Sequence, residues 1–360
     1  MMVSVDELIK LVFEKNASDL HISVGLPPTI RIDGRLTRLD YPPFSQENVE
    51  KIVFDMLSNE QRRILEQNWE LDCSYGVEGI GRFRINVYRE RGHYAIALRT
   101  ISTDIPGFSQ LGLPDTIREL SEKPRGLILV TGPTGCGKST TLAAIIDYIN
   151  SNRIEHILTI EDPIEYLHYS KRSIVHQREL GHDTRSFSNA LRAALREDPD
   201  IILIGEMRDL ETISLALTAA ETGHLVLGTL HTSSASQTID RVVDVFPAQQ
   251  QQQVRIQLSN SLVGVLSQTL LPRVCQDGTK KGRVLALETM IVTPAISNLI
   301  REGKTSQIYS AIQTGSQQKM QTMESCLKDL CLRKLITYED ALSKSSRPDD
   351  LKRMLQDVYL

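Results

Sequence analysis

The chain has 360 residues, enough for two or three domains with complete cores. Its 41 Lys and Arg residues stand against 45 Asp and Glu residues, and the net charge of −4 gives no overall attraction to nucleic acid or to anionic lipid. No stretch approaches the roughly 18 uninterrupted apolar residues of a membrane span, and the N-terminus has no signal-peptide pattern. The cysteines are scattered without a C-x-x-C pair, which favours a reducing, cytoplasmic compartment over a structural zinc site.

Changes in pattern along the chain divide it into four parts. We expect an N-terminal domain over 1–101, a linker over 102–120, a core domain over 121–290 and a helical region over 291–360. The linker is marked by the turn-forming dipeptide Pro106-Gly107 and by further Gly and Pro residues.

The first part mixes helices with strands. Apolar spacing and turn residues predict two helices and two hairpins. The helices are Leu8 to Phe13 and Asn48 to Leu57; the hairpins join Thr29 to Ile32 with Arg35 to Leu39 around Asp33-Gly34, and Gly81 to Val87 with Tyr94 to Ile101 around Arg91-Gly92. His21 is interpreted as a strand residue.

The core domain alternates buried strands with helices, a pattern that predicts a parallel α/β sheet. The expected strands are Leu127 to Thr131, His156 to Ile160, Ile201 to Ile204, Leu225 to Thr229 and Val284 to Glu288. The expected helices are 139–150, 186–196, 209–222, 234–245 and 248–267. The last part has no strand pattern, and we predict helices at Ala295 to Arg301, Thr305 to Thr314 and Met323 to Lys334.

A glycine-rich segment follows the first of these strands and matches the phosphate-binding pattern G-x-x-x-x-G-K-[ST]. The segment is Gly132-Pro133-Thr134-Gly135-Cys136-Gly137-Lys138-Ser139-Thr140. Glycines let backbone N–H groups approach phosphate oxygens, and the N-terminus of the following helix favours negative charge. Lys138 would reach the β- and γ-phosphates, and the Ser139 hydroxyl would bind Mg²⁺. The sequence therefore predicts an ATP-binding site that uses Mg²⁺.

Two clusters of carboxylates follow other strands of the same predicted sheet. One is Glu161-Asp162-Pro163-Ile164-Glu165, and the other begins at Glu206 after Ile201 to Gly205. Ligands of open α/β sheets bind at the carboxyl ends of the strands, where both clusters would lie. Acids that only cap helices are the alternative for either cluster alone. Next to a phosphate loop, we expect carboxylates that hold Mg²⁺ and orient water, with Glu206 at the metal.

Basic residues and a histidine complete the candidate site. His231 ends a predicted strand, where a sensor of the γ-phosphate would lie, although a structural histidine remains an alternative. Arginines are concentrated in the strands that end the first domain, and we favour Arg84 and Arg99 as arginine fingers that act on the site of a neighbouring subunit. A solvated basic face is the alternative.

These segments together resemble the secretion-type ATPase superfamily, and specifically the PilT-like ATPases that retract type IV pili. The matching segments are Ser18 to Ile22, the glycine-rich loop, Thr159 to Glu165, Gly205 to Asp209 and Thr222 to Thr232. Ala295 to Glu302 is similar to the signature of the retraction branch, with Ser297 in place of its usual Arg.

The resemblance implies a homohexamer whose subunits have a PAS-like N-terminal domain and a RecA-like ATPase domain with a helical C-terminal region. It implies that Glu165 is the general base, that Glu206 supports Mg²⁺ and water, and that His231 senses the phosphate. It also implies a motor at the inner-membrane base of the pilus that works on a membrane platform protein. The charge balance and the lack of aromatic residues interleaved with basic ones argue against a nucleic-acid partner. The alternatives within the family are a PilU-type accessory retraction ATPase and an ATPase of pilus assembly or type II secretion.

Overall fold

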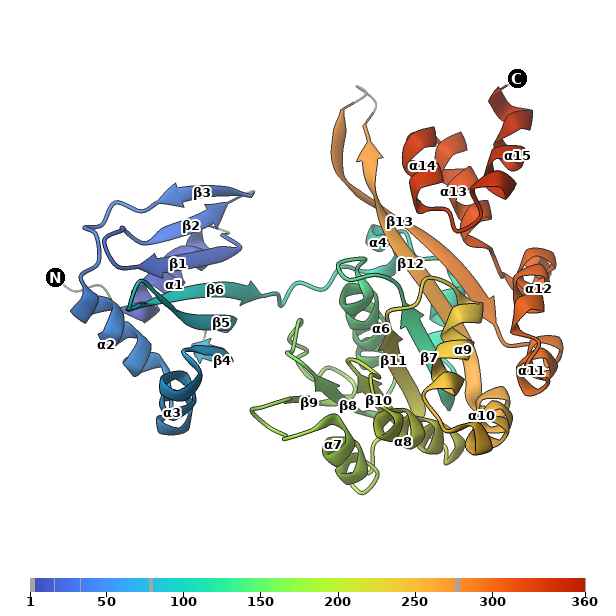
Figure 1. Ribbon diagram of the computed structural model, residues 1–360, viewed down its shortest axis with the longest axis horizontal. Helices are drawn as coiled ribbons and strands as arrows, with labels where there is room; N and C mark the ends of the chain where they lie inside the picture. Colours follow the sequence, from blue (N-terminus) through green and yellow to red (C-terminus); the bar gives the residue numbers. More distant parts are fainter. Residues whose placement is uncertain (1–3, 16, 33, 78–79, 276–278, 360) are drawn as a thin grey trace. The chain divides into compact units, whose positions relative to one another are not determined.

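The computed structural model describes residues 4–15, 17–32, 34–77, 80–275 and 279–359. Residues 357–359 are described by their backbone alone. It consists of two units (Figure 1). The first contains the residues up to Asp104 together with Pro163–Leu167, and the second contains Ile105–Asp162 together with His168–Leu360.

The first unit is an α+β unit built on a six-stranded antiparallel sheet with the order β3-β2-β1-β6-β5-β4. Its strands are β1 (Asp19–Ser23), β2 (Thr29–Ile32), β3 (Arg35–Arg38), β4 (Glu70–Val77), β5 (Gly81–Glu90) and β6 (His93–Ile101), and its helices are α1 (Val5–Glu14), α2 (Gln46–Met56) and α3 (Asn59–Asn68). Side chains alternate between the two faces: Phe83 and Ile85 are buried in the core, whereas Arg84 between them is exposed. One face of the sheet therefore forms the core with the helices.

Both predicted hairpins are confirmed. In the β5–β6 hairpin, Arg91 and Gly92 have φ angles of 51° and 86°, as a two-residue primed turn requires. In the β2–β3 hairpin Ile32 pairs with Arg35, and Asp33 lies outside the described residues. Helix α3 has no counterpart among the predicted elements because it buries only Leu65, which leaves no apolar periodicity to recognise.

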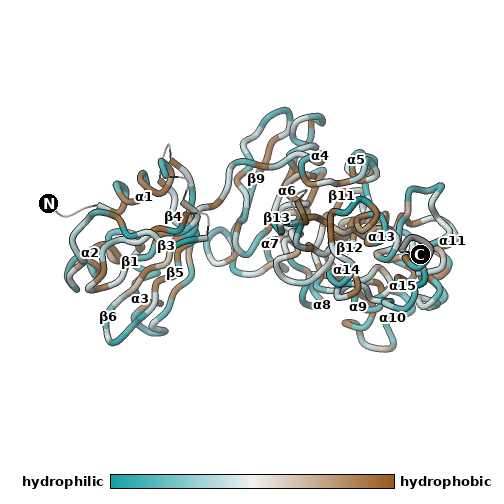
Figure 2. Tube along the Cα trace, turned by 90° about the horizontal axis from the view of Figure 1, so that it is seen from above, coloured by the Kyte–Doolittle hydropathy of each residue, from teal (hydrophilic) through white to brown (hydrophobic). Residues whose placement is uncertain are grey.

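The second unit contains a seven-stranded sheet with the order β13-β12-β7-β11-β10-β8-β9. Its strands are β7 (Gly126–Thr131), β8 (His156–Glu161), β9 (Ile174–Glu179), β10 (Ile201–Ile204), β11 (Leu225–Leu230), β12 (Leu262–Val274) and β13 (Lys280–Ile291). The surrounding helices are α6 (Lys138–Asn152), α7 (Phe187–Ala194), α8 (Leu210–Glu221), α9 (Ala235–Asp244) and α10 (Ala248–Ser261). The strands β7, β10 and β11 are buried along their whole length, and hydrophobic colour follows the interior of this unit, including β12, in Figure 2. The predicted α/β fold class is confirmed.

Two predictions for this sheet were wrong. The helix expected over 248–267 ends at Ser261, and β12 begins at the next residue without a Gly or Pro between them. A buried apolar run after a helix has no feature that separates the two elements, because strand and helix interiors are both apolar there. The strand expected at Val284 to Glu288 is confirmed as part of β13, but its expected parallel direction is wrong. β13 pairs antiparallel with β12, while the rest of the sheet is parallel.

The segment expected to be a linker contains two short helices, α4 (Phe108–Leu111) and α5 (Thr116–Ser121). Ile117 and Leu120 of α5 are buried against α6 and the sheet of the second unit. These side chains attach residues 108–121 to the core of that unit.

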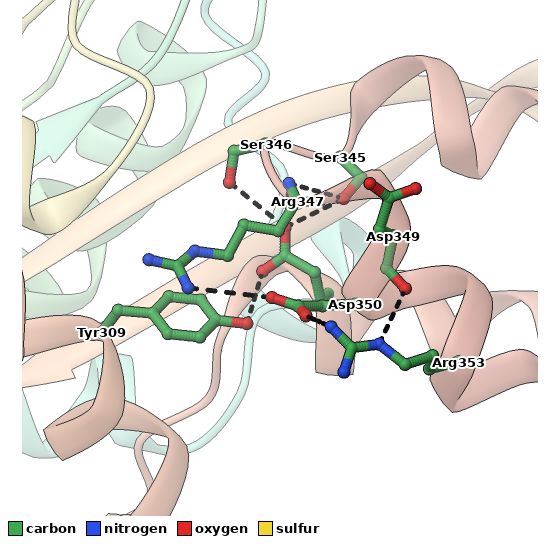
Figure 3. A network of polar contacts seen from close by, with 8 residues as sticks. Tyr309, Ser345, Ser346, Arg347, Asp349, Asp350 and Arg353 are labelled. Carbon is green, nitrogen blue, oxygen red and sulfur yellow. Dashed lines mark hydrogen bonds and ion pairs between the residues drawn. The ribbon is translucent and has the colours of Figure 1, made fainter.

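In the described residues after β13 the regular elements are helices, as predicted. They are α11 (Pro294–Arg301), α12 (Ile308–Thr314), α13 (Met323–Leu332), α14 (Tyr338–Lys344) and α15 (Pro348–Tyr359), with 3₁₀ turns η1 (Thr305–Gln307) and η2 (Ser316–Gln318). A polar network joins α12, α13 and the segment before α15 around Glu324 of α13, which is fully buried. Figure 3 shows its partners Tyr309, Ser345, Ser346 and Arg347. Glu324 accepts hydrogen bonds from the Tyr309 hydroxyl at 3.2 Å, from the hydroxyls of Ser345 and Ser346 and from the backbone N–H of Arg347.

Among the described residues, no helix combines the length and the apolar composition that crossing a membrane requires.

Candidate nucleotide-binding site

The glycine-rich loop connects the end of β7 at Thr131 with the start of α6 at Lys138. Gly132, Gly135 and Gly137 have φ angles of 141°, 78° and 88°, which residues with side chains rarely adopt. The first N–H groups of α6 have no partner within the helix, and the helix dipole makes this end favourable for negative charge. The loop therefore has the backbone of an anion-binding site.

Lys138 lies across this loop. Its Nζ atom donates hydrogen bonds to the main-chain oxygens of Gly132 at 2.8 Å and Pro133 at 3.2 Å. The same atom lies 3.4 Å from Nδ1 of His231. Three acceptors thus hold the ammonium group at the loop, next to the exposed side chain of Ser139.

Glu206 follows the end of β10 and is held by two basic side chains. Arg208 donates to Oε2 of Glu206 at 2.7 Å, with its Nε 2.6 Å from Oε1, and Nε2 of His231 lies 3.1 Å from Oε1. The hydrogen bond from Arg208 is the main reason that the pKa of Glu206 is lowered from its ordinary value, although partial burial opposes this effect. Glu206 is therefore a carboxylate at neutral pH.

His231 connects Lys138 with Glu206. Because an ammonium group can only donate, Nδ1 of His231 is the acceptor in its contact with Lys138. The proton of a neutral ring is then on Nε2, which donates to Glu206. The predicted site residues Lys138, His231 and Glu206 thus form one chain of polar contacts that continues to Arg208.

Small residues bring the ends of these strands close together. A Cβ atom on Gly205 would lie 3.2 Å from Cα of Glu161, and one on Gly228 would lie 2.4 Å from Sδ of Met207. The Thr229 hydroxyl donates to the main-chain oxygen of Gly205 at 2.5 Å, which fixes the backbone just before Glu206. A side chain at either glycine would crowd these neighbours, so the two glycines let the strand ends pack this closely.

The first acidic cluster is divided between the two units. Glu161 ends β8 in the second unit, where the Thr159 hydroxyl donates to its Oε1 at 2.6 Å and Gln177 donates to the same oxygen at 3.2 Å. Glu165 belongs to Pro163–Leu167 of the first unit and is exposed.

Arg84 and Arg99 also belong to the first unit. Nε of Arg99 donates to Asp19 of β1 at 2.8 Å, and Nε of Arg84 lies 3.9 Å from Asp72 of β4. Both side chains are on the exposed face of the sheet, at 46% exposure for Arg84 and 70% for Arg99. Their guanidinium groups remain accessible to an anion.

Two residues of the site were not assigned from the sequence. Arg208 lies inside the second acidic segment, two residues after Glu206, and that spacing is the signal that could have identified it. Gln268 contacts the loop from β12, through a bond from its Nε2 to the main-chain oxygen of Cys136. The wrong helix prediction over 248–267 concealed this residue because it obscured the strand that carries it.

Comparison with known proteins gives one consistent family. The family model described as "Type II/IV secretion system protein" matches residues 2–341. The type IV pilus retraction ATPase PilT of Pseudomonas aeruginosa is 53% identical over 348 residues, which cover 97% of this chain and 100% of that protein. The type IV pilus ATPase PilU of the same organism is 40% identical over 351 residues, which cover 98% and 91%.

A solved structure agrees with these relatives. The crystal structure of the pilus retraction motor PilT with bound ADP superposes with a TM-score of 0.90 at 53% identity, covering 98% of this chain and 100% of that one. The chain therefore belongs to the type II/IV secretion system protein family and is a P-loop ATPase of that family.

Proposed function

We propose that this chain is the ATP-hydrolysing motor that drives retraction of type IV pili, and thereby twitching motility. The observation that supports it most directly is the chain of contacts from Lys138 through His231 to Glu206, because it connects a phosphate-binding lysine with a carboxylate at the end of β10. The full-length similarity to the PilT retraction ATPase supports pilus retraction rather than pilus assembly.

The residues present suit ATP with Mg²⁺. Mg²⁺ in such sites is held by few protein ligands and by phosphate oxygens and water, so the absence of a cluster of three His, Cys, Asp or Glu side chains among the described residues is compatible with it. Ser139 would bind the metal directly, and Glu206 would hold its water. When bound, Mg²⁺ would neutralise charge on the β- and γ-phosphates.

The protein side chains would then carry out the remaining steps. Lys138 would exchange its contacts with the carbonyls of Gly132 and Pro133 for phosphate oxygens, which are stronger acceptors because they are charged. His231 would follow this movement through Nδ1 and so respond to the γ-phosphate. We assign Glu165 as the general base and the remaining loop residues, Gly132 to Thr140, to the nucleotide phosphates.

The N-terminal domain (1–101) would contribute to catalysis through its arginines. We propose that the chain forms a homohexamer in which Arg84 and Arg99 act on the nucleotide of a neighbouring subunit. In this proposal residues 102–107, the part of the predicted linker (102–120) that precedes α4, let the N-terminal domain and the ATPase core (121–290) move relative to each other. The ring, with its helical region (291–360), would act at the cytoplasmic side of the inner membrane on the platform protein of the pilus.

A PilU-type accessory ATPase is the second candidate, because the similarity to PilU also extends over the whole chain. Deletion of the gene in its own bacterium separates the alternatives. A retraction motor requires cells that lose twitching and carry excess surface pili, with recovery by the wild-type gene and none by Lys138→Ala. Bald cells would contradict retraction and indicate assembly, and normal twitching would indicate an accessory role.

A further inference from the structure

Gln268 lies beside the point where the chain leaves the sheet to form the phosphate loop. β12 runs parallel to β7, with Ser267 opposite Thr131, the last residue of β7. β12 continues beyond this pair, so Gln268 is next to Gly132 at the start of the loop. The Gln268 residue is 2% exposed.

The side chain of Gln268 on β12 binds the C-terminal end of the loop, where the loop joins α6. Its Nε2 donates to the main-chain oxygen of Cys136 at 2.8 Å, and its Oε1 accepts from the Thr141 hydroxyl at 3.0 Å. The main-chain oxygen of the same residue would lie 2.2 Å from a Cβ atom on Gly132. One residue of β12 therefore contacts the first glycine of the loop, its last turn and the first turn of α6.

The bond to Cys136 has a consequence for the nucleotide. The C=O of Cys136 and the N–H of Gly137 belong to the same planar trans peptide, so they point in opposite directions. When Nε2 of Gln268 holds the carbonyl toward β12, the N–H of Gly137 points to the opposite side of the loop. Gly137 is the N-cap residue of α6, and this end of the helix favours negative charge.

We propose that Gln268 is a positioning residue for ATP, which fixes the Cys136–Gly137 peptide so that its N–H faces the phosphates. This inference rests on the ATP-binding function proposed for the loop. A glycine-rich backbone has many accessible conformations. If the peptide is already fixed before binding, the entropic cost of ordering the loop around the nucleotide is smaller. Gln268 would therefore act on nucleotide affinity more than on the chemical step.

Gln268→Met tests the proposal, because methionine has a similar length and flexibility without the amide. We expect the KM for ATP and the Kd for ADP to rise about tenfold, the effect of a lost buried hydrogen bond, with a smaller change in kcat. ADP affinity is measured by titration calorimetry on the purified full chain. Unchanged KM and Kd would overturn the proposal.

A matched control is Gln321→Met. The Gln321 side chain also donates to a main-chain oxygen at 2.8 Å, that of Leu287 on β13, but has no part in the loop. Its nucleotide affinity should remain within twofold of the wild type, whereas an equal loss in both variants would indicate a general effect on folding and overturn the proposal. If Gln268→Met does not fold, Thr141→Val replaces it: a smaller rise in Kd supports the proposal and an unchanged Kd overturns it.

Gln268→Glu adds a readout that a purely structural role would not change. An ionised carboxylate cannot donate to the oxygen of Cys136, but the protonated form can, and it is neutral like the amide. ADP affinity relative to the wild type should therefore recover as the pH falls from about 8.5 to about 6. A flat or falling ratio would overturn the proposal. All these readouts concern purified protein, so the proposal can fail while retraction, which is measured in cells, still holds.

Discussion

Arg84 of β5 and Arg99 of β6 are direct cross-strand partners, on the exposed face of the first unit. Like charges at such positions repel, because opposite Cβ atoms are only about 5 Å apart. Asp19 balances Arg99, at 2.8 Å, and Asp72 lies near Arg84, at 3.9 Å. A pair of arginines that is held together against repulsion, with both side chains accessible, is suited to an anionic ligand.

The two arginines should respond differently to substitution. Arg84→Gln removes repulsion and a distant exposed ion pair, so we expect stability to change by less than about 0.5 kcal/mol. Arg99→Gln leaves Asp19, whose side chain is 9% exposed, with Arg31 at 3.6 Å and the Ser18 hydroxyl at 2.8 Å, and should cost about 1 kcal/mol. Urea unfolding of the isolated variants measures both values.

ATP turnover should fall in both variants if the arginines act in the proposed ring. Mixing either variant with Lys138→Ala should restore part of the activity, because each subunit supplies what its neighbour lacks. Arg63→Gln, at an exposed position on α3, is the control for the loss of one positive charge. Full activity of Arg84→Gln and Arg99→Gln would exclude them as arginine fingers.

Glu206→Gln should bind ATP but hydrolyse it slowly. The amide keeps the size of the side chain and loses the charge that would hold the water of Mg²⁺, so we expect kcat to fall about 100-fold with little change in ADP affinity. Glu211→Gln is the control, because Glu211 forms only an exposed ion pair with Arg192 on the surface. Normal turnover by Glu206→Gln would show that the carboxylate at the end of β10 is not the functional one.

Arg208→Gln should move the acid limb of the pH–rate profile. The hydrogen bond from Arg208 is the largest cause of the lowered pKa of Glu206. In the wild type this carboxylate stays ionised well into the acid range, and without Arg208 its protonation should begin at higher pH, so that activity is lost earlier as the pH falls. Arg208→Lys should restore part of the shift, and identical acid limbs in Arg208→Gln and the wild type would argue against this role of the arginine.

The sequence identified the elements whose signals are local. Short sequence patterns were enough to predict three features, because each pattern is typical of one structure. These features are the phosphate loop, the acid after β10 and the Arg91-Gly92 turn. β12 did not, because its buried apolar run continues directly from α10 at Ser261, and only pairing with β7 decides between strand and helix. Gln268 was missed for this reason. The contact between His231 and Lys138 joins residues far apart in the chain and required the fold.

Glu288 should make the stability of the second unit depend on pH. This residue of β13 is buried, and its Oε1 accepts a hydrogen bond from the backbone N–H of Ala235, the first residue of α9, at 2.7 Å. Burial is the main reason that its pKa is raised to about 7; the charge of the neighbouring Glu324 acts in the same direction, and the N–H groups of Ala235 and Met323 act against it. Glu324 itself accepts hydrogen bonds from Tyr309 and Ser345, which are labelled in Figure 3.

Because the folded state binds the proton of Glu288 more tightly than the unfolded state does, protonation of Glu288 stabilises the fold. The stabilisation is complete below the ordinary pKa of 4.5, decreases as the pH rises and is lost above about 7, a difference of about 3 kcal/mol. Glu288→Gln keeps an acceptor for Ala235 and carries no charge, so it should be more stable than the wild type at about pH 8.5 and similar to it at about pH 5. Urea midpoints of the second unit at both pH values measure the difference, with Glu302→Gln as the exposed control. Parallel midpoints for Glu288→Gln and the wild type would mean that Glu288 is ionised in the folded protein throughout this range.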